Sequence, residues 1–201
     1  MTQDRGHPTS ASTLSPEKQI AFALLIFERM LPSLITFSKH TGLDGSCYLR
    51  ARDLAWERLQ GKAGSADDMD RLNRLCLKSA PDTEDFTHEQ TSFALNAAVT
   101  MSEILEFMLN RNPDLVSHVS TFATDSVHLY LSGLEPSLIT TKEKINRIAA
   151  HTLMQQELDR QKEDIRFLSG LPDPFGEPAI DSLQRRVASQ PPLLPAAFTT
   201  H

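Results

Sequence analysis

Carboxylates next to apolar or aromatic residues are the side chains of this sequence best placed to do chemistry. Glu28 directly follows the most apolar stretch of the chain, and Glu103 lies in a helix-like stretch rich in small residues. Asp53 and Glu57 are four residues apart around Trp56, a spacing that puts both acids on one face of a helix. Because a buried carboxylate is costly without a partner, these acids predict either a pocket for a cation or basic group, or internal ion pairs.

Arginines close to these acids favour the ion-pair interpretation. Four guanidinium groups lie near them in the sequence, at Arg29, Arg50, Arg52 and Arg58. The candidate binding or structural ion-pair site therefore has six members: Glu28, Arg29, Asp53, Trp56, Glu57 and Glu103. The alternative is a carboxylate-based site for a metal or cationic ligand, which could belong to an enzyme. That alternative requires at least three of the four acids to converge with no arginine between them.

Other kinds of chemistry have no signature in the sequence. There is no His-Glu-x-x-His, Cys-x-x-Cys or Glu-x-x-His pair, no phosphate-binding glycine loop and no Gly-x-Ser-x-Gly motif. We therefore assign no catalytic residue, no metal ligand and no cofactor. His118, His128 and His151 could converge across helices, although isolated histidines of this kind are usually solvated or structural. Cys47 and Cys76 lie among apolar neighbours, which favours buried reduced thiols over a redox or metal role.

The composition predicts an ordinary globular protein. Of 201 residues, 40% are hydrophobic and 23% are charged, which suits one substantial core. The formal charge of −6 argues against a nucleic-acid or anionic-membrane binder. The longest fully apolar run, residues 20–27, is shorter than the roughly 20 residues that a membrane span needs. Residues 1–15 have no basic stretch followed by an apolar one, so we predict a cytoplasmic protein with no membrane partner.

The hydrophobic periodicity predicts an all-α protein. Apolar residues recur at helical spacing along most of the chain, and residues 20–27 are apolar nearly all round. We expect a single compact bundle of six or seven helices, with this apolar N-terminal helix at its centre. The predicted organisation is a flexible tail over 1–14, a helical domain over 15–189 and a Pro-rich tail, frayed from Gln190, over 190–201.

Capping and breaking residues predict where the helices begin and end. Ser15 and Pro16 should start the first helix, with the Ser15 hydroxyl accepting from a free amide, and Pro32 should interrupt it. Ser65 should cap another helix. Further helices are expected over about 47–60, from Ser65, over 88–110, from Pro113 to a break at Gly133 and Pro136, over 141–169 without interruption, and over 179–189.

Several segments also resemble one known family. They are residues 19–42 with Glu-Arg-Met-Leu-Pro at 28–32, Asp-Leu-Ala-Trp-Glu at 53–57, the Ala-rich stretch 96–103 ending in Ser-Glu, and Gln-Gln-Glu at 155–157. In this order they are similar to the bacterial YjaG-like proteins, the domain of unknown function 416, over about residues 15–170. The resemblance implies a compact helical bundle and no particular activity. It makes Glu28, Arg29, Trp56, Glu57 and Glu103 the first site candidates, and the chain departs from the family pattern after Gly170.

The leading functional hypothesis is a non-enzymatic protein-interaction module. Trp56, Tyr48 and Phe37 lie on or near helix ends and would anchor an interface if they are exposed together. The partner would be another protein or a second copy of this chain, and an immunity-type role is one version of the hypothesis. Residues 61–112 carry a net charge of −4 out of the total of −6 and could meet a basic partner, although such acidic runs more often keep a surface solvated.

Overall fold

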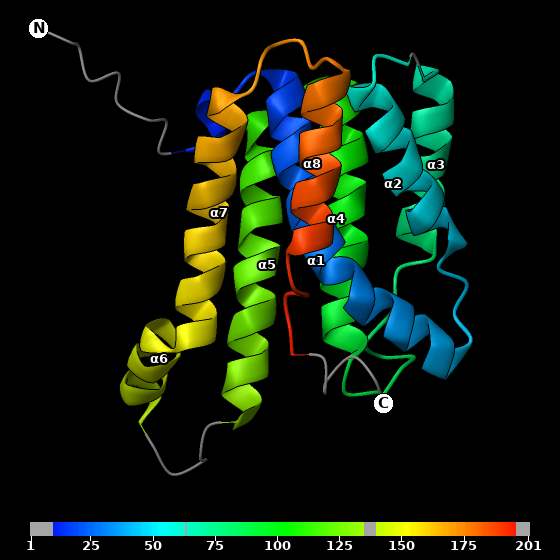
Figure 1. Ribbon diagram of the computed structural model, residues 1–201. Helices are drawn as coiled ribbons and strands as arrows, with labels where there is room; N and C mark the ends of the chain where they lie inside the picture. The colour runs from blue at the N-terminus through cyan, green and yellow to red at the C-terminus, as the bar shows by residue number, and fades with distance from the viewer. Residues whose placement is uncertain (1–9, 63, 135–139, 196–201) are drawn as a thin grey trace, which may run out of the picture.

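The protein is a bundle of α-helices (Figure 1). The computed structural model describes residues 10–62, 64–134 and 140–195. Within these ranges there is a 3-10 turn, η1, at Ala11–Thr13, followed by eight α-helices and no strand. The helices are α1 (Pro16–Thr41), α2 (Ser46–Leu59), α3 (Ala66–Lys78), α4 (Thr91–Asn110), α5 (Pro113–Leu134), α6 (Thr141–Ala150), α7 (Thr152–Gly170) and α8 (Glu177–Ser189). The predicted all-α class is confirmed, with slightly more helices than expected.

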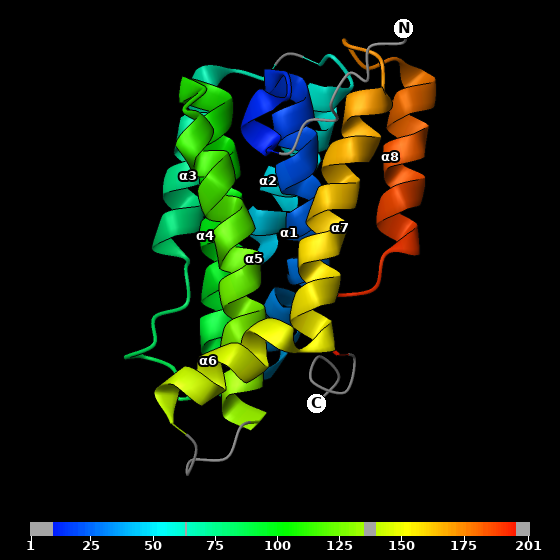
Figure 2. The same ribbon diagram turned by 90° about the vertical axis from the view of Figure 1, so that its left-hand side faces the viewer.

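Helix α1 is the centre of the bundle, as its apolar sequence predicts. Residues 20–27 are at most 1% exposed, and α1 contacts α2, α4, α5, α7 and α8. Figure 2 shows α4 and α5 on one side of it, and α7 and α8 on the other. Its most extensive contact is with α4, where Ala94, Ala97 and Ala98 are buried and their small side chains allow a close approach.

The predicted interruption of the first helix at Pro32 is wrong. Helix α1 runs continuously through Pro32 to Thr41, and Gly42, whose φ is 76°, forms a left-handed cap after it. Proline removes one backbone hydrogen bond and bends a helix without necessarily ending it. Figure 1 shows the C-terminal part of α1 leaving the direction of its first part. Leu31 and Leu34 remain buried on either side of the proline, so packing holds the bent helix together.

The predicted unbroken helix over 141–169 is also wrong. The chain is extended at His151, which separates α6 from α7. The His151 ring nitrogen Nδ1 accepts a hydrogen bond from the Leu153 amide at 3.1 Å and so caps α7. Helix α6 then crosses the ends of α5 and α7 (Figure 2), and Ile148 is its buried anchor.

The two predicted serine caps have different outcomes. Ser65 Oγ accepts from the Asp68 amide at 3.3 Å, which confirms the cap of α3. Ser15 lies at the N-cap of α1 but makes no capping hydrogen bond, and its buried hydroxyl has no partner. The expected start at residue 88 is also early, because α4 begins at Thr91.

The chain after α8 packs against the bundle over the residues that the structure describes. Leu193 and Leu194 are each 2% exposed, and the Leu193 amide donates to the Arg29 carbonyl at 2.8 Å. This part of the predicted Pro-rich tail is therefore not frayed. The rest of that tail (196–201), most of the predicted N-terminal tail (1–9) and the expected break at Pro136 lie outside the described residues.

Helices α1 and α4 are long and apolar enough to cross a membrane, by length and composition alone. In the bundle, 83% of the apolar window of α1 and 61% of that of α4 are buried inside the protein. Core helices of soluble proteins pass the same test, so this property is only a weak sign of a membrane protein.

Candidate functional site

Glu28 and Trp56 form the first contact of the candidate site. Glu28 lies on the face of α1 turned toward α2, and the Trp56 indole Nε1 donates to its Oε1 at 2.9 Å. Both side chains are partly buried. The nearest polar partner of Glu28 is thus an indole N–H rather than a guanidinium group, and the bond fixes the Trp56 ring beside the carboxylate.

Arg52 is the cation next to this pair. Its Nε lies 4.0 Å from Glu28 Oε1, and its Nη2 donates to Asp53 Oδ1 at 2.7 Å. Glu57, one turn further along α2, lies 3.6 Å from Lys62 Nζ. Arg52 is one of the four arginines expected to neutralise these acids, and it contacts two of the acids, Glu28 and Asp53.

Three of the predicted acids and Trp56 line one surface pocket of about 410 Å³. Helix α8 forms the opposite wall, since the full lining is Glu28, Arg52, Asp53, Trp56, Glu57, Gln60, Lys62, Gln184 and Val187. A second pocket of about 430 Å³ shares part of this wall and is lined by Gln60, Lys62, Phe175, Gly176, Glu177, Ile180, Asp181 and Gln184. We call the two together the α2–α8 groove.

The α2–α8 groove is acidic and carries two aromatic side chains. Its linings hold five carboxylates and two cationic side chains, with Trp56 in one pocket and Phe175 in the other. Neither lining includes a serine, cysteine or histidine. The groove therefore presents groups for binding rather than a nucleophile with its base.

Glu103 lies apart from this groove. It belongs to α4, where its Oε2 is 3.4 Å from His118 Nδ1 on α5. Burial raises the pKa of Glu103, and the nearby His118 opposes that rise. Because Arg52 contacts both Glu28 and Asp53, the condition set for a carboxylate metal site is not met. Among the described residues, no group of three His, Cys, Asp or Glu side chains is arranged to hold a metal ion.

Arg29, the remaining predicted member, points away from the groove into a buried cluster. Its Nη2 donates to Glu157 at 2.9 Å, and its Nη1 donates to Asp164 and to Gln190, each at 2.8 Å. Arg186 Nε also donates to Asp164, at 2.7 Å. These five residues, which we call the Arg29 cluster, join α1, α7, α8 and the C-terminal segment.

Electrostatic attraction outweighs burial at Arg29. Burial alone would lower the pKa of this side chain, but the attraction of Glu157 and Asp164 raises it above its usual value. Arg29, Glu157 and Asp164 have side chains that are at most 2% exposed. Such a buried charge cluster is stable only as a whole, because removing one member leaves another charge without its partner.

The sequence prediction did not include Glu157, Asp164, Arg186 and Gln190. A signal for the two acids is present, since Glu157, Gln161 and Asp164 follow each other at helical spacing and Leu168 continues the same face. Polar residues on the buried stripe of a helix require internal partners. No comparable pattern marks Arg186 or Gln190, because their positions depend on how α8 and the C-terminal segment dock.

Other predicted candidates are separated by the fold. Tyr48 and Phe37 are fully buried, so they do not form an exposed aromatic cluster with Trp56. The Tyr48 hydroxyl donates instead to the Cys76 carbonyl at 2.8 Å. The three histidines do not converge: His118 lies near Glu103, His128 near Ser132 at 3.5 Å, and His151 caps α7.

Comparison with known proteins gives the family. Residues 9–190 match the family described as proteins of unknown function, DUF416. The chain belongs to this family. The family predicted from the sequence is thus confirmed, and the match covers α1 to α8 and every residue of the candidate site.

A solved structure of the DUF416 family has the same fold. It is the crystal structure of a DUF416 family protein from Shewanella baltica OS155, with a TM-score of 0.79 and 19% sequence identity. The match covers 89% of this chain and 91% of that chain. At this identity the likeness establishes the fold alone. No curated protein matches the chain.

Proposed function

We propose that this protein is a protein-interaction module that binds a basic segment of a partner protein in the α2–α8 groove. The observation that carries the proposal is the gathering of Glu28, Asp53, Trp56 and Glu57 along one groove, whose opposite wall on α8 adds Glu177 and Asp181. The cytoplasmic location and the identity of the partner stay predictions.

The charge of the groove determines the kind of partner. Asp53 and Glu57 have cationic neighbours in Arg52 and Lys62, yet the linings still hold more carboxylates than cations. A segment rich in Lys and Arg complements this surface and associates with it faster than an acidic one would. The attraction acts between partly exposed groups, so added salt should weaken it.

Trp56 provides the aromatic contact that such a segment needs. Its indole N–H is already bonded to Glu28, and its side chain lines the pocket, so a bound segment would meet the ring rather than the N–H. An Arg or Lys side chain over an indole ring gains cation–π attraction in addition to charge pairing. Large aromatic side chains in partly closed pockets are also the residues on which binding energy concentrates.

The test is a titration with a synthetic peptide that alternates Arg and Leu, compared with a peptide that alternates Glu and Leu. Trp56 is the only tryptophan in the chain, so its fluorescence reports directly on the groove. We expect the basic peptide to change the fluorescence saturably and the acidic peptide to leave it unchanged. If neither peptide binds at low salt, the proposal is wrong.

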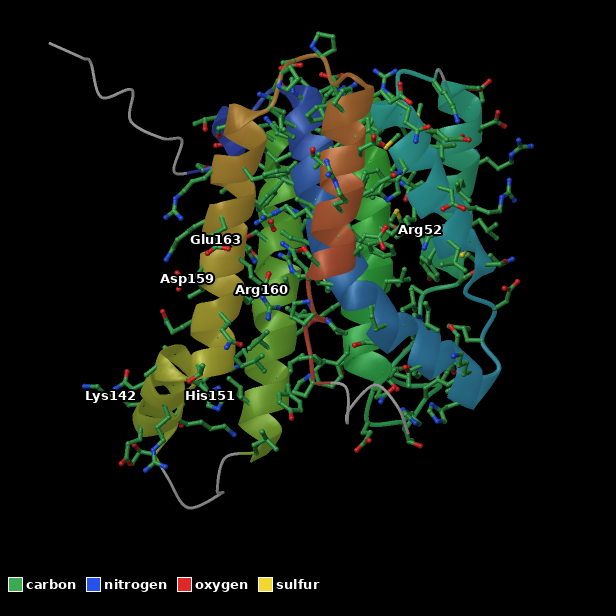
Figure 3. All side chains as sticks on the ribbon, in the orientation of Figure 1. Arg52, Lys142, His151, Asp159, Arg160 and Glu163 are labelled. Carbon is green, nitrogen blue, oxygen red and sulfur yellow. The ribbon has the colours of Figure 1, made fainter. Side chains whose placement is uncertain are left out.

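A matched pair of double variants locates the site. Glu177→Lys with Asp181→Lys reverses two groove charges four residues apart on α8, and Asp159→Lys with Glu163→Lys makes the same change on α7. Figure 3 shows Asp159 and Glu163 on α7, on the opposite side of the bundle from Arg52. We expect the α8 variant to bind the basic peptide about tenfold more weakly and the α7 variant to bind normally. Equal losses in both variants would mean non-specific attraction to a negative protein.

Self-association is the version of the proposal in which the partner is a second copy. Light scattering during size-exclusion chromatography measures the mass of the full chain at micromolar concentrations. A dimer that dissociates when Glu177 and Asp181 are reversed would identify a second copy as the occupant of the groove. A strict monomer would leave a different protein as the partner.

A further inference from the structure

Helix α6 is the most positively charged of the helices that the structure describes. It holds Lys142, Lys144 and Arg147 against one carboxylate, Glu143, and no other described helix has so large an excess of cations. Within α6 only Ile148 is buried, so most of the helix surface faces solvent. Because the chain as a whole has a charge of −6, this cationic surface is opposite in sign to the molecule that carries it.

Exposed apolar side chains also lie at this end of the bundle. Leu129 and Leu134, in the last two turns of α5, are exposed, and Ile145 on α6 is 53% exposed. These three make up half of the large hydrophobic side chains that are exposed in the described part of the chain. Ile145 follows Lys142 by three residues, so the two side chains share one face of α6. We call the exposed side of this helix, with Lys142, Lys144, Ile145 and Arg147, the α6 surface.

The α6 surface matches the α2–α8 groove in charge and in size. The groove linings hold five carboxylates, two cationic side chains and the aromatic side chains of Trp56 and Phe175. The cations of α6 complement the carboxylates, and Ile145 supplies an apolar contact of the kind that anchors a helix in a groove. Along α8 the lining extends from Glu177 to Val187, about 15 Å at the rise of an α-helix. The 10 residues of α6 have the same length.

One chain cannot place its own α6 in its own groove. Figure 3 shows Lys142, on α6, and Arg52, which lines the groove, on opposite sides of the molecule. Helix α6 is also held where it is, because Ile148 is buried and Lys144 Nζ donates to the Ser132 carbonyl at 2.8 Å. A contact between the α6 surface and the groove therefore joins two copies.

We propose that the segment bound in the α2–α8 groove is helix α6 of a second copy of this chain. This inference rests on the proposed function and names the occupant of the groove. Because the contact joins different surfaces of the two copies, a bound pair still offers one free groove and one free α6 surface. The protein should therefore assemble head to tail, into an open chain or a closed ring. Salt should weaken the assembly, since the charges that attract each other are partly exposed.

The experiment mixes two variants that each keep only one of the two surfaces. The groove variant is Glu177→Lys with Asp181→Lys, and the α6 variant is Lys142→Glu with Ile145→Glu. Light scattering during size-exclusion chromatography should give each variant alone the mass of one chain. Their equimolar mixture should have twice that mass, because the α6 of the groove variant fits the intact groove of the α6 variant and no further contact can form. The unmodified chain should form larger species than the mixture does.

Helix α3 offers a matched control for the α6 variant. Arg74→Glu with Leu77→Glu also replaces a cation and an exposed apolar side chain three residues apart. This control should assemble as the unmodified chain does. If it loses assembly as fully as the α6 variant, the effect is not specific to α6 and the proposal is overturned.

The peptide titration separates a failure of this inference from a failure of the proposed function. If the basic peptide binds in the groove while the unmodified chain and the mixture both remain single chains at about 100 μM, α6 is not the occupant and the proposed function stands. If neither the peptide nor a second copy binds, both are wrong. Assembly of the α6 variant on its own would also overturn the inference, because another segment would then fill the groove. The mass of the unmodified chain tests the inference without any substitution.

Discussion

Arg29 shows how one side chain can organise several distant parts of the chain. Its two terminal nitrogens reach Glu157 and Asp164 on α7 and Gln190 after α8, while its backbone carbonyl accepts from the Leu193 amide. A lysine could not replace it, because one ammonium group lacks the flat, forked shape that reaches two carboxylates at once. The residue directly before it, Glu28, faces the groove. Of these two adjacent residues, Arg29 therefore forms ion pairs in the core, and Glu28 lines a surface pocket.

Removing Arg29 should be strongly destabilising. In Arg29→Met, Glu157 and Asp164 stay buried without their main partner, and we expect the free energy of unfolding to fall by about 3–5 kcal/mol. Urea denaturation measures this change. The matched control is Lys162→Met, which breaks the exposed pair with Asp159 and should cost less than about 1 kcal/mol. Similar losses in both variants would contradict a special role for the Arg29 cluster.

Glu103 should make stability depend on pH. Burial raises its pKa in the folded protein above the value in the unfolded chain, so the folded state binds this proton more tightly. The resulting stabilisation is complete below the ordinary pKa of glutamate and is lost as the pH rises through the raised folded value.

The substitution Glu103→Gln removes this titration. The variant should therefore become more stable relative to the wild type as the pH rises to neutrality, by less than about 1 kcal/mol. Thermal melting at a series of pH values measures the difference. The control is Glu89→Gln, which removes an exposed carboxylate just before the same helix and leaves Glu103 and its charged neighbours in place, and it should show no such trend. A difference for Glu103→Gln that is constant with pH would contradict the role of burial.

At the level of helices, residues at the helix ends contribute to stability in addition to the apolar faces. Helix α3 has a side-chain cap from Ser65, α7 from His151 and α6 from Thr140, whose hydroxyl accepts from the Glu143 amide. Each cap lies where the chain changes direction between two helices. Helix α1 has no such cap, and its burial on all sides stabilises it instead.

The two serines at N-cap positions allow a direct comparison. Ser65→Ala removes the hydrogen bond to the Asp68 amide and should cost about 1 kcal/mol of stability. Ser15→Ala removes a buried hydroxyl that has no partner and should be neutral or slightly stabilising. Urea unfolding of both variants measures the contrast, and a larger loss for Ser15→Ala would show that its hydroxyl has a partner in solution.

At the scale of the whole molecule, the two ends of the helical sequence meet in the core. The segment after α8 places Leu193 and Leu194 against the bundle and Gln190 in the Arg29 cluster. Helix α1 is therefore covered by the last residues that the structure describes as well as by its neighbours in sequence. We therefore expect early and late segments to depend on each other for stability.

Truncation tests this dependence. A chain that ends at Ser189 loses two buried leucines and the hydrogen bonds of Gln190, and its free energy of unfolding should fall by about 3 kcal/mol or more. A chain that ends at Pro195 keeps all of these contacts and is the control. Denaturation in urea followed by circular dichroism measures both, and an unchanged midpoint for the shorter chain would contradict the packing described for this segment.

The sequence predicts the parts of the structure that local patterns determine. The apolar residues 20–27 correctly identify the central helix, and the spacing of Asp53, Trp56 and Glu57 correctly places them on one side of α2. The predictions of a helix break at Pro32 and of an unbroken helix through His151 are wrong, because tertiary packing decides whether a helix bends or ends. The partners of Arg29 could not be predicted from neighbouring residues, since they are 128 to 161 positions away in the chain.

The late covering of α1 has a consequence for synthesis on the ribosome. The most apolar helix is made before α7, α8 and the residues that bond to Arg29. Until α7 and α8 are made, the side of this apolar helix that they cover is therefore exposed or is shielded by something other than its own chain. A nascent chain halted before α7 should bind a chaperone that the finished, released protein no longer recruits.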